Sequence, residues 1–155
     1  MEQFANLDPT LKVNPSGDQA KEYMQAGTEQ PVMYLNLLRY HEVARYPADY
    51  AQPALPPNVS GREAFHRYLK EIETTLLPQV GGRFLLVAPI ELVVIGAADW
   101  DEVMLGFYPS RAAGMRFTSL PGYETAALHR LAGVAEMITL ILGKEAFARM
   151  QLPMT

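Results

Sequence analysis

The chain contains no cysteine, which excludes disulfide bonds, thiolate chemistry and zinc sites built on thiolates. Clusters of lysine and arginine are also lacking and the formal net charge is −4, so the sequence has no basic face of the kind that binds nucleic acid. The apolar runs are far shorter than the ~20 residues of a membrane helix, and no basic segment followed by an apolar one begins the chain. We therefore expect a cytoplasmic protein without a membrane or nucleic-acid partner.

The common motifs of enzymes and cofactor sites are missing as well. The three histidines, His41, His66 and His129, do not have the spacing of metal ligands. There is no glycine-rich dinucleotide fingerprint, no phosphate-binding loop and no Gly-x-Ser-x-Gly elbow. We expect neither a metal nor a cofactor.

What the sequence does contain is a globular composition. Of its 155 residues 49% are hydrophobic and 19% are charged, which fits one domain with a real core. We expect that domain over residues 31–142. An N-terminal arm with a short helix (1–30) precedes it, and a C-terminal helix or tail (143–155) follows.

The most apolar stretch, residues 32–40, predicts a strand that is covered on both faces. Asn36 lies in its middle, where an unpaired amide would cost about 1–3 kcal/mol. This amide is therefore bonded to its neighbours or turned toward a cavity.

Capping and periodicity predict the other elements. Ser16 with Gln19 begins a helix over 18–26, and Ser60 with Glu63 begins the strongest helix, which Gly81 ends. The apolar stripe of that helix is Phe65, Tyr68, Leu69, Ile72, Leu76 and Val80. The remaining elements are expected to be strands over 83–87, 103–108 and 137–142, and helices over 111–119, 123–131 and 144–150. Residues 91–95 are expected to resume the strand that Pro89 interrupts, as one bent strand or a tight hairpin.

This order of elements is the split β-α-β pattern of an α+β, ferredoxin-like fold. Helices cover one face of such a sheet, yet the predicted strands are apolar on both faces. A second copy of the same sheet is the economical cover, so we expect a homodimer that forms a dimeric α/β barrel.

The sequence resembles the "domain of unknown function 1330" family of the dimeric α/β-barrel superfamily. The resemblance is carried by residues 31–40, 60–68, 81–83, 100–101, 108–111 and 121–123, with His129 and Arg130. One departure is Gly114-Met115-Arg116, where similar sequences have a Phe-x-x-Met pattern. The resemblance implies the fold and the dimer. Superfamily relatives include cofactor-independent monooxygenases, lactone isomerases and haem enzymes, whose pockets tend to lie between the sheet and its helices.

Seven residues are candidates for such a pocket. Asn36 is a candidate for holding a substrate oxygen, and His129 for moving a proton, although the C-terminal end of a helix would also favour a cation at His129. The expected substrate-binding residues are Tyr40, Tyr68, Arg83, Tyr108 and Arg111. For the tyrosines, the structural alternative is a core aromatic residue with a bonded hydroxyl group.

Two arginines stand out among these candidates. Arg83 follows two glycines and either binds a carboxylate or forms a salt bridge to the preceding helix. Arg111 is a cation in the first turn of a helix, which favours an acidic residue or an anionic ligand as its partner. The sequence thus leaves three possibilities: a cofactor-independent enzyme of oxidation or isomerisation, a small-ligand binding protein, or a structural dimer. It leaves open whether the long loop 41–60 closes over the site.

Overall fold

A computed structural model describes residues 14–27, 29–47, 50 and 58–150 of the chain. Its centre is one antiparallel sheet with the strand order β2-β3-β1-β4. The strands are β1 (Val32–Tyr40), β2 (Arg83–Pro89), β3 (Glu102–Tyr108) and β4 (Val134–Ile141). The expected α+β class and four-stranded sheet are confirmed, and the strand order is that of a ferredoxin-like fold.

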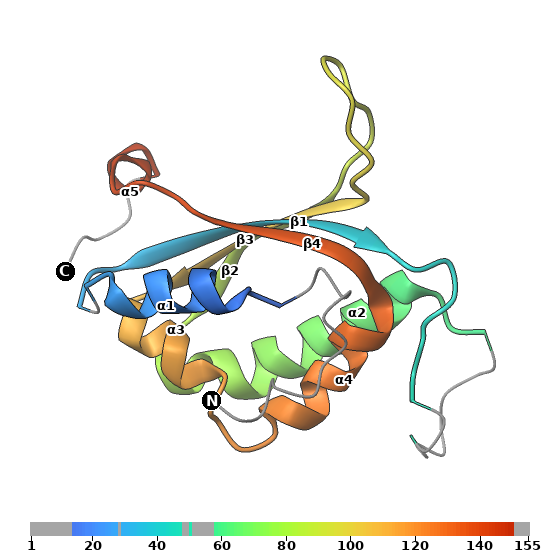
Figure 1. The fold of residues 1–155 in the computed structure, drawn as a ribbon, viewed down its shortest axis with the longest axis horizontal. Coiled ribbons are helices and arrows are strands. Elements are labelled where there is room, and N and C mark those ends of the chain that lie inside the picture. The colour runs from blue at the N-terminus through green and yellow to red at the C-terminus, as the bar shows by residue number, and fades with distance from the viewer. Residues whose placement is uncertain (1–13, 28, 48–49, 51–57, 151–155) are drawn as a thin grey trace.

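The helices form a layer under one face of this sheet, as Figure 1 shows for α1 to α4. Their bounds are α1 (Gly17–Gln25), α2 (Gly61–Glu71), α3 (Arg111–Phe117) and α4 (Tyr123–Gly133). A π-helical turn, η2 (Ile72–Leu76), and a 3₁₀ turn, η3 (Leu77–Val80), continue α2. A short helix, α5 (Glu145–Arg149), lies on the opposite face of the sheet (Figure 1). No helix in the described part of the chain is long and apolar enough to cross a membrane.

The capping signals predicted both helix starts correctly. Ser16 and Ser60 each accept a hydrogen bond from the backbone of the third helical residue, and the side chains of Gln19 and Glu63 reach back to the caps. Gly81 ends η3 in the left-handed conformation with φ +69°, which a glycine adopts without strain.

The main core lies between the sheet and the helices. All six residues of the predicted stripe on α2 and its continuation are buried there. They pack against Leu38 of β1, Met104 of β3 and Val134 of β4, which all face the helices. Periodicity alone was therefore sufficient to find the helical side of this core.

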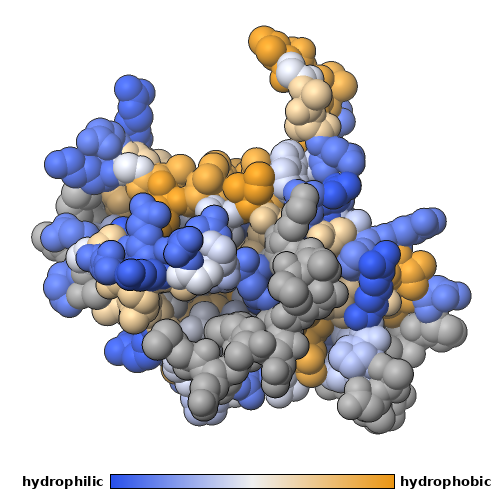
Figure 2. Space-filling view, viewed as in Figure 1, coloured by the Kyte–Doolittle hydropathy of each residue, from blue (hydrophilic) through white to orange (hydrophobic). Residues whose placement is uncertain are grey.

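The other face of the sheet carries a continuous apolar surface, which we call the open face. Cross-strand pairing places Leu35 beside Leu105 and Leu140, and Leu37 beside Val103 and Ile138. Leu86 of β2 lies opposite Leu105. Helix α5 covers one end of this face, where Phe147 packs on Met33 and Phe107. Figure 2 shows the uncovered part as a band of hydrophobic side chains.

The prediction of a strand over residues 91–95 is wrong. Residues 90–101 form no strand and instead leave the body as a long projection, which we call the arm (Figure 1). The backbone N–H of Ile90 donates to the carbonyl oxygen of Asp101 at 2.8 Å and closes the base of the arm. Branched aliphatic residues favour a strand, but a strand also needs a hydrogen-bonded partner strand. This segment projects beyond the ends of β2 and β3, where the sheet offers none.

Candidate functional site

Three tyrosines and an arginine meet between the sheet and the helices, and we call this group the tyrosine–arginine cluster. Tyr34 comes from β1, Tyr108 from the end of β3, Tyr23 from α1 and Arg111 from the start of α3. The hydroxyl groups of Tyr23 and Tyr34 share a hydrogen bond, and the Tyr34 ring meets the Tyr108 ring edge to face at 5.5 Å. Gly114 makes room for the group, because a Cβ there would lie 2.9 Å from the Tyr34 hydroxyl oxygen.

Burial raises the pKa of Tyr34 and of Tyr108 well above the usual value for a phenol. For Tyr34 the neighbouring Tyr23 raises the pKa further, while Arg111 opposes the effect. Both phenols therefore remain protonated near neutral pH. In this state they donate hydrogen bonds and do not serve as bases.

Arg111 is the cationic member of the cluster. Its guanidinium carbon lies 5.1 Å from the centre of the Tyr23 ring. Its Nε is buried, and among the described residues this nitrogen has no hydrogen-bond partner and the side chain pairs with no carboxylate. Leaving such a donor unpaired is unfavourable. An acceptor with a negative charge would satisfy it.

Tyr68 continues this polar interior on the other side of Tyr108. It is buried on α2, and burial together with the neighbouring Tyr123 raises its pKa. Arg130 of α4 acts in the opposite direction on that pKa, and its Nη2 donates to Asn14 Oδ1 at 3.4 Å. Phenol groups from three helices and two strands thus gather between the sheet and the helices, where the sequence predicts a pocket.

Asn36 faces the helices from the middle of β1. Its Oδ1 accepts a hydrogen bond from the Thr139 hydroxyl group at 2.7 Å, and its Nδ2 donates to the Tyr34 carbonyl oxygen at 3.4 Å. The structural role is therefore realised, because this amide ties β1 to the edge strand β4. Its place next to Tyr34 also puts it beside the cluster.

His129 lies apart from these residues, between α4 and the loop that follows β1. Its Nδ1 and the hydroxyl oxygen of Tyr46 are hydrogen-bonded at 2.7 Å. The rings of Tyr46 and Tyr50 stack at 4.9 Å, and both meet the His129 ring edge to face. Burial lowers the pKa of His129, which keeps the imidazole neutral near pH 7. This part of the loop therefore covers His129, and not the cluster.

A second polar group lies at the end of the sheet from which the arm projects. Glu102 is 0% exposed, and it accepts hydrogen bonds from Arg62 Nε and Nη2 at 3.2 Å each. His66 Nε2 lies 3.0 Å from its Oε1. Tyr40 is close by, and burial followed by the Glu102 carboxylate raises its pKa. The group joins α2 to the first residue of β3.

Arg83 lies on the open face, with its guanidinium carbon 4.3 Å from the centre of the Phe107 ring. The seven predicted residues therefore divide among four places. Asn36, Tyr68, Tyr108 and Arg111 belong to one interior region, and the other three do not reach it. Tyr23 and Tyr34 are not among the candidates that the sequence suggests, although both lie in elements that it predicts.

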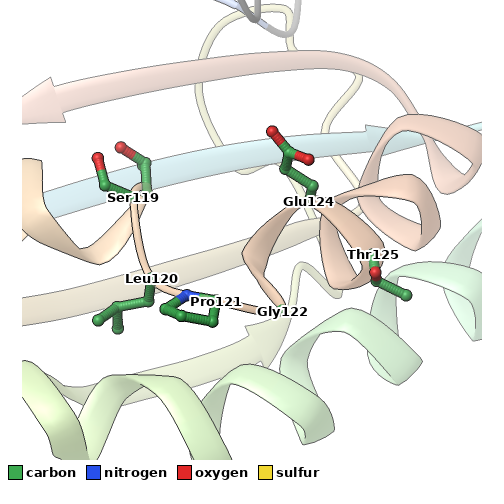
Figure 3. Close-up of a pocket in the computed structure, with 7 residues that line it drawn as sticks. Ser119, Leu120, Pro121, Gly122, Glu124 and Thr125 are labelled. Atoms are coloured by element: carbon green, nitrogen blue, oxygen red, sulfur yellow. The ribbon is translucent and has the colours of Figure 1, made fainter.

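A hollow of about 270 Å³ opens at the connection between α3 and α4 (Figure 3). It is lined by Thr118, Ser119, Leu120, Pro121, Gly122, Glu124 and Thr125. The lining consists largely of a turn, with one carboxylate and no cation. It therefore offers less for recognition than the tyrosine–arginine cluster does.

These features define an α+β protein with a polar interior cluster and one uncovered sheet face. No protein-family model matches the chain, and no curated protein is detectably similar to it. It is similar to two crystal structures of RPA0582. One, of the methylated protein, has a TM-score of 0.73 at 27% identity and covers 86% of this chain and 94% of that chain. The other, a structural genomics target of unknown function from Rhodopseudomonas palustris, has a TM-score of 0.69 at 27% identity. It covers 84% of this chain and 94% of that chain.

Proposed function

We propose that this protein is a homodimer that binds a small organic anion, such as a carboxylate, at the tyrosine–arginine cluster. The observation that carries the proposal is the buried Nε of Arg111, which has no partner among the described residues. A carboxylate would accept from this donor and from whichever hydroxyl group, of Tyr23 or Tyr34, accepts in the hydrogen bond that the two share. Arg111 and the pair of phenols thus supply one positive charge and at least two donors from three separate elements.

Binding is favoured here over catalysis. An oxidation or isomerisation without a cofactor needs a proton acceptor beside the substrate. The raised pKa values of Tyr34 and Tyr108 make these groups donors, and the His129 imidazole is engaged by Tyr46 elsewhere. The enzymatic alternative would be supported by turnover that is lost on His129→Ala while the affinity for the ligand is kept.

The test measures ligand affinity and stability in the same variants. Benzoate, 4-hydroxybenzoate, acetate and succinate serve as probes in isothermal titration calorimetry with the full chain. Arg111→Met is expected to weaken binding of the best probe by about 10- to 100-fold, because a hydrogen bond to a charged group is lost. Arg116→Met is the matched control, since Arg116 is exposed at the other end of α3.

Stability separates the binding role from a structural one. If Arg111 serves a ligand, Arg111→Met keeps the free energy of unfolding of the ligand-free protein within about 1 kcal/mol of the wild type, because the removal of an unpaired donor offsets the loss of the contact with the Tyr23 ring. If Arg111 is structural, Arg111→Met destabilises the ligand-free protein. A loss of stability of more than about 1 kcal/mol, or probe affinities equal in both variants, would refute the proposed site.

The homodimer is supported by the open face. Leu86, Ile138 and Leu140 are exposed there beside the partly buried Leu35 and Leu37. Continuous apolar surfaces of this kind mark interfaces in soluble proteins. Leu140→Asp is expected to give a monomer in light scattering, whereas Thr74→Asp on the outer side of the helices leaves the dimer intact. A wild-type chain that is monomeric at 100 µM would contradict the dimer.

A further inference from the structure

The tip of the arm carries the most exposed apolar side chains described in this molecule. Leu92, Val94 and Ile95 are 75%, 83% and 93% exposed, and Val93 lies between them. Figure 2 shows the tip as a hydrophobic knob that stands clear of the body. Single exposed aliphatic residues are ordinary, but four in succession on a projection indicate a surface that another molecule covers.

The base of the arm, in contrast, is well anchored. The backbone N–H of Asp101 donates to the Leu38 carbonyl oxygen at 2.8 Å, and the Asp101 carboxylate accepts from the Tyr40 N–H at 2.7 Å. Asp99 also pairs with Arg39 at 3.4 Å. These contacts fix the direction in which the arm leaves the sheet, so that the tip is presented to a partner instead of folding back.

The arm rises on the same side of the sheet as the open face (Figure 1). Strands β2 and β3, which the arm connects, contribute Leu86, Val103 and Leu105 to that face. The apolar surface of the sheet and the apolar tip therefore lie on the same side of the molecule, opposite the helices. A molecule that packs on the open face would also lie within reach of the tip.

We infer that the tip, Leu92 to Ile95, packs against a second copy of this chain, so that each arm of a homodimer contacts the opposite protomer. We call this the arm contact. This inference rests on the dimer proposed above and adds a second contact to it. In a two-fold dimer each arm makes the same contact, so that both tips are covered at once.

Charge argues against a membrane as the occupant. Residues 84–110 contain no lysine or arginine, whereas Glu91, Asp99, Asp101 and Glu102 are acidic. An apolar segment that inserts into an anionic lipid surface is ordinarily flanked by basic residues, and acidic ones repel such a surface. The continuity of the tip with the open face favours a protein surface, and a second copy supplies it.

The absence of cysteine from the chain makes crosslinking a clean test. Ile95→Cys is labelled with a benzophenone maleimide and irradiated. Crosslinked products of dimer mass are expected, with the attachment sites mapped by mass spectrometry to peptides of the partner. Labelling of Glu73→Cys, exposed on the outer side of the helices, is the control and is expected to give none.

A second variant measures how much the tip contributes to the dimer. Val94→Asp/Ile95→Asp is expected to raise the dissociation constant of the dimer by about 100-fold, because two anchor residues become charged. The far-ultraviolet circular dichroism is expected to remain that of the wild type, because the tip supports no structure of its own chain. Thr74→Asp is the matched control for an added carboxylate.

The outcomes separate the two proposals. A weaker dimer together with crosslinks between protomers supports the arm contact. An unchanged dissociation constant, or crosslinks only within one chain, overturns it and leaves the dimer of the open face standing, because Leu140→Asp tests that dimer separately. A monomeric wild type overturns both. Binding of the wild type, but not of the double variant, to vesicles with 30% phosphatidylserine would show a lipid partner and overturn the arm contact as well.

Discussion

Glu102 pairs with Arg62 and His66, but only the Glu102 carboxylate is fully buried, and this difference allows a quantitative prediction about stability. The carboxylate is 0% exposed, whereas the side chains of its partners Arg62 and His66 are 53% and 41% exposed. If Glu102 is replaced with leucine, both partners turn toward water, and the loss is expected to be about 1–2 kcal/mol. If Arg62→Met and His66→Phe remove the partners instead, a charge stays buried without compensation, and the loss is expected to be about 3–5 kcal/mol.

Urea denaturation followed by circular dichroism measures both losses. The protein concentration is held constant, because a dimer ties the free energy of unfolding to concentration. Glu73→Gln, an exposed carboxylate on η2, is the control and is expected to change stability by less than about 0.5 kcal/mol. Equal losses, or a larger loss for Glu102→Leu than for the double variant, would refute the argument that the carboxylate is the desolvated member of the group.

Three further predictions concern packing and pH. Gly61→Ala is expected to destabilise the protein by more than about 3 kcal/mol in the same denaturation assay, because its Cβ would lie 2.3 Å from the His41 carbonyl oxygen. Phe147→Ala is expected to cost about 3–5 kcal/mol and to expose the end of the open face, which the binding of a hydrophobic dye would report. Burial lowers the pKa of His129, so the folded state binds its proton less readily than the unfolded state does. The free energy of unfolding should therefore be highest above pH 6.5, fall as the pH drops below that value, and level off below the lowered pKa. His129→Gln should remove the contribution of His129 to this dependence and leave that of His41, whose pKa burial also lowers.

The sequence was a sufficient guide where structure is local. Helix α2 begins at the predicted capping box, and its six apolar positions are all in the core. Strand β1 has the predicted bounds because nine successive residues suit a sheet with two apolar faces. These features depend on the spacing of apolar residues within one segment, and this spacing can be read directly from the sequence.

The tyrosine–arginine cluster could be predicted only in part. Tyr108 and Arg111 were candidates because each ends or begins an element, and their chemistry was visible. Their meeting with Tyr23 and Tyr34 depends on how α1 lies against β1, and no periodic pattern encodes that. The departure at Gly114 was visible in the sequence, but its consequence was not, because the contact with the Tyr34 hydroxyl group is between different elements.

The wrong prediction at residues 91–95 has the same origin as the open face. Leu92 to Ile95 have the composition of a strand, and a strand with such side chains is stable only when a neighbour covers them. No described residue of the chain covers Leu92 to Ile95, and Leu140 and Ile138 on β4 are likewise exposed. Local preference and the fold of the single chain disagree at both places. Natural sequences tend to carry such disagreement where another molecule binds. In the proposed dimer one cause accounts for both observations: the apolar side chains of these segments would pack against the second copy, so the structure of one chain alone leaves them uncovered.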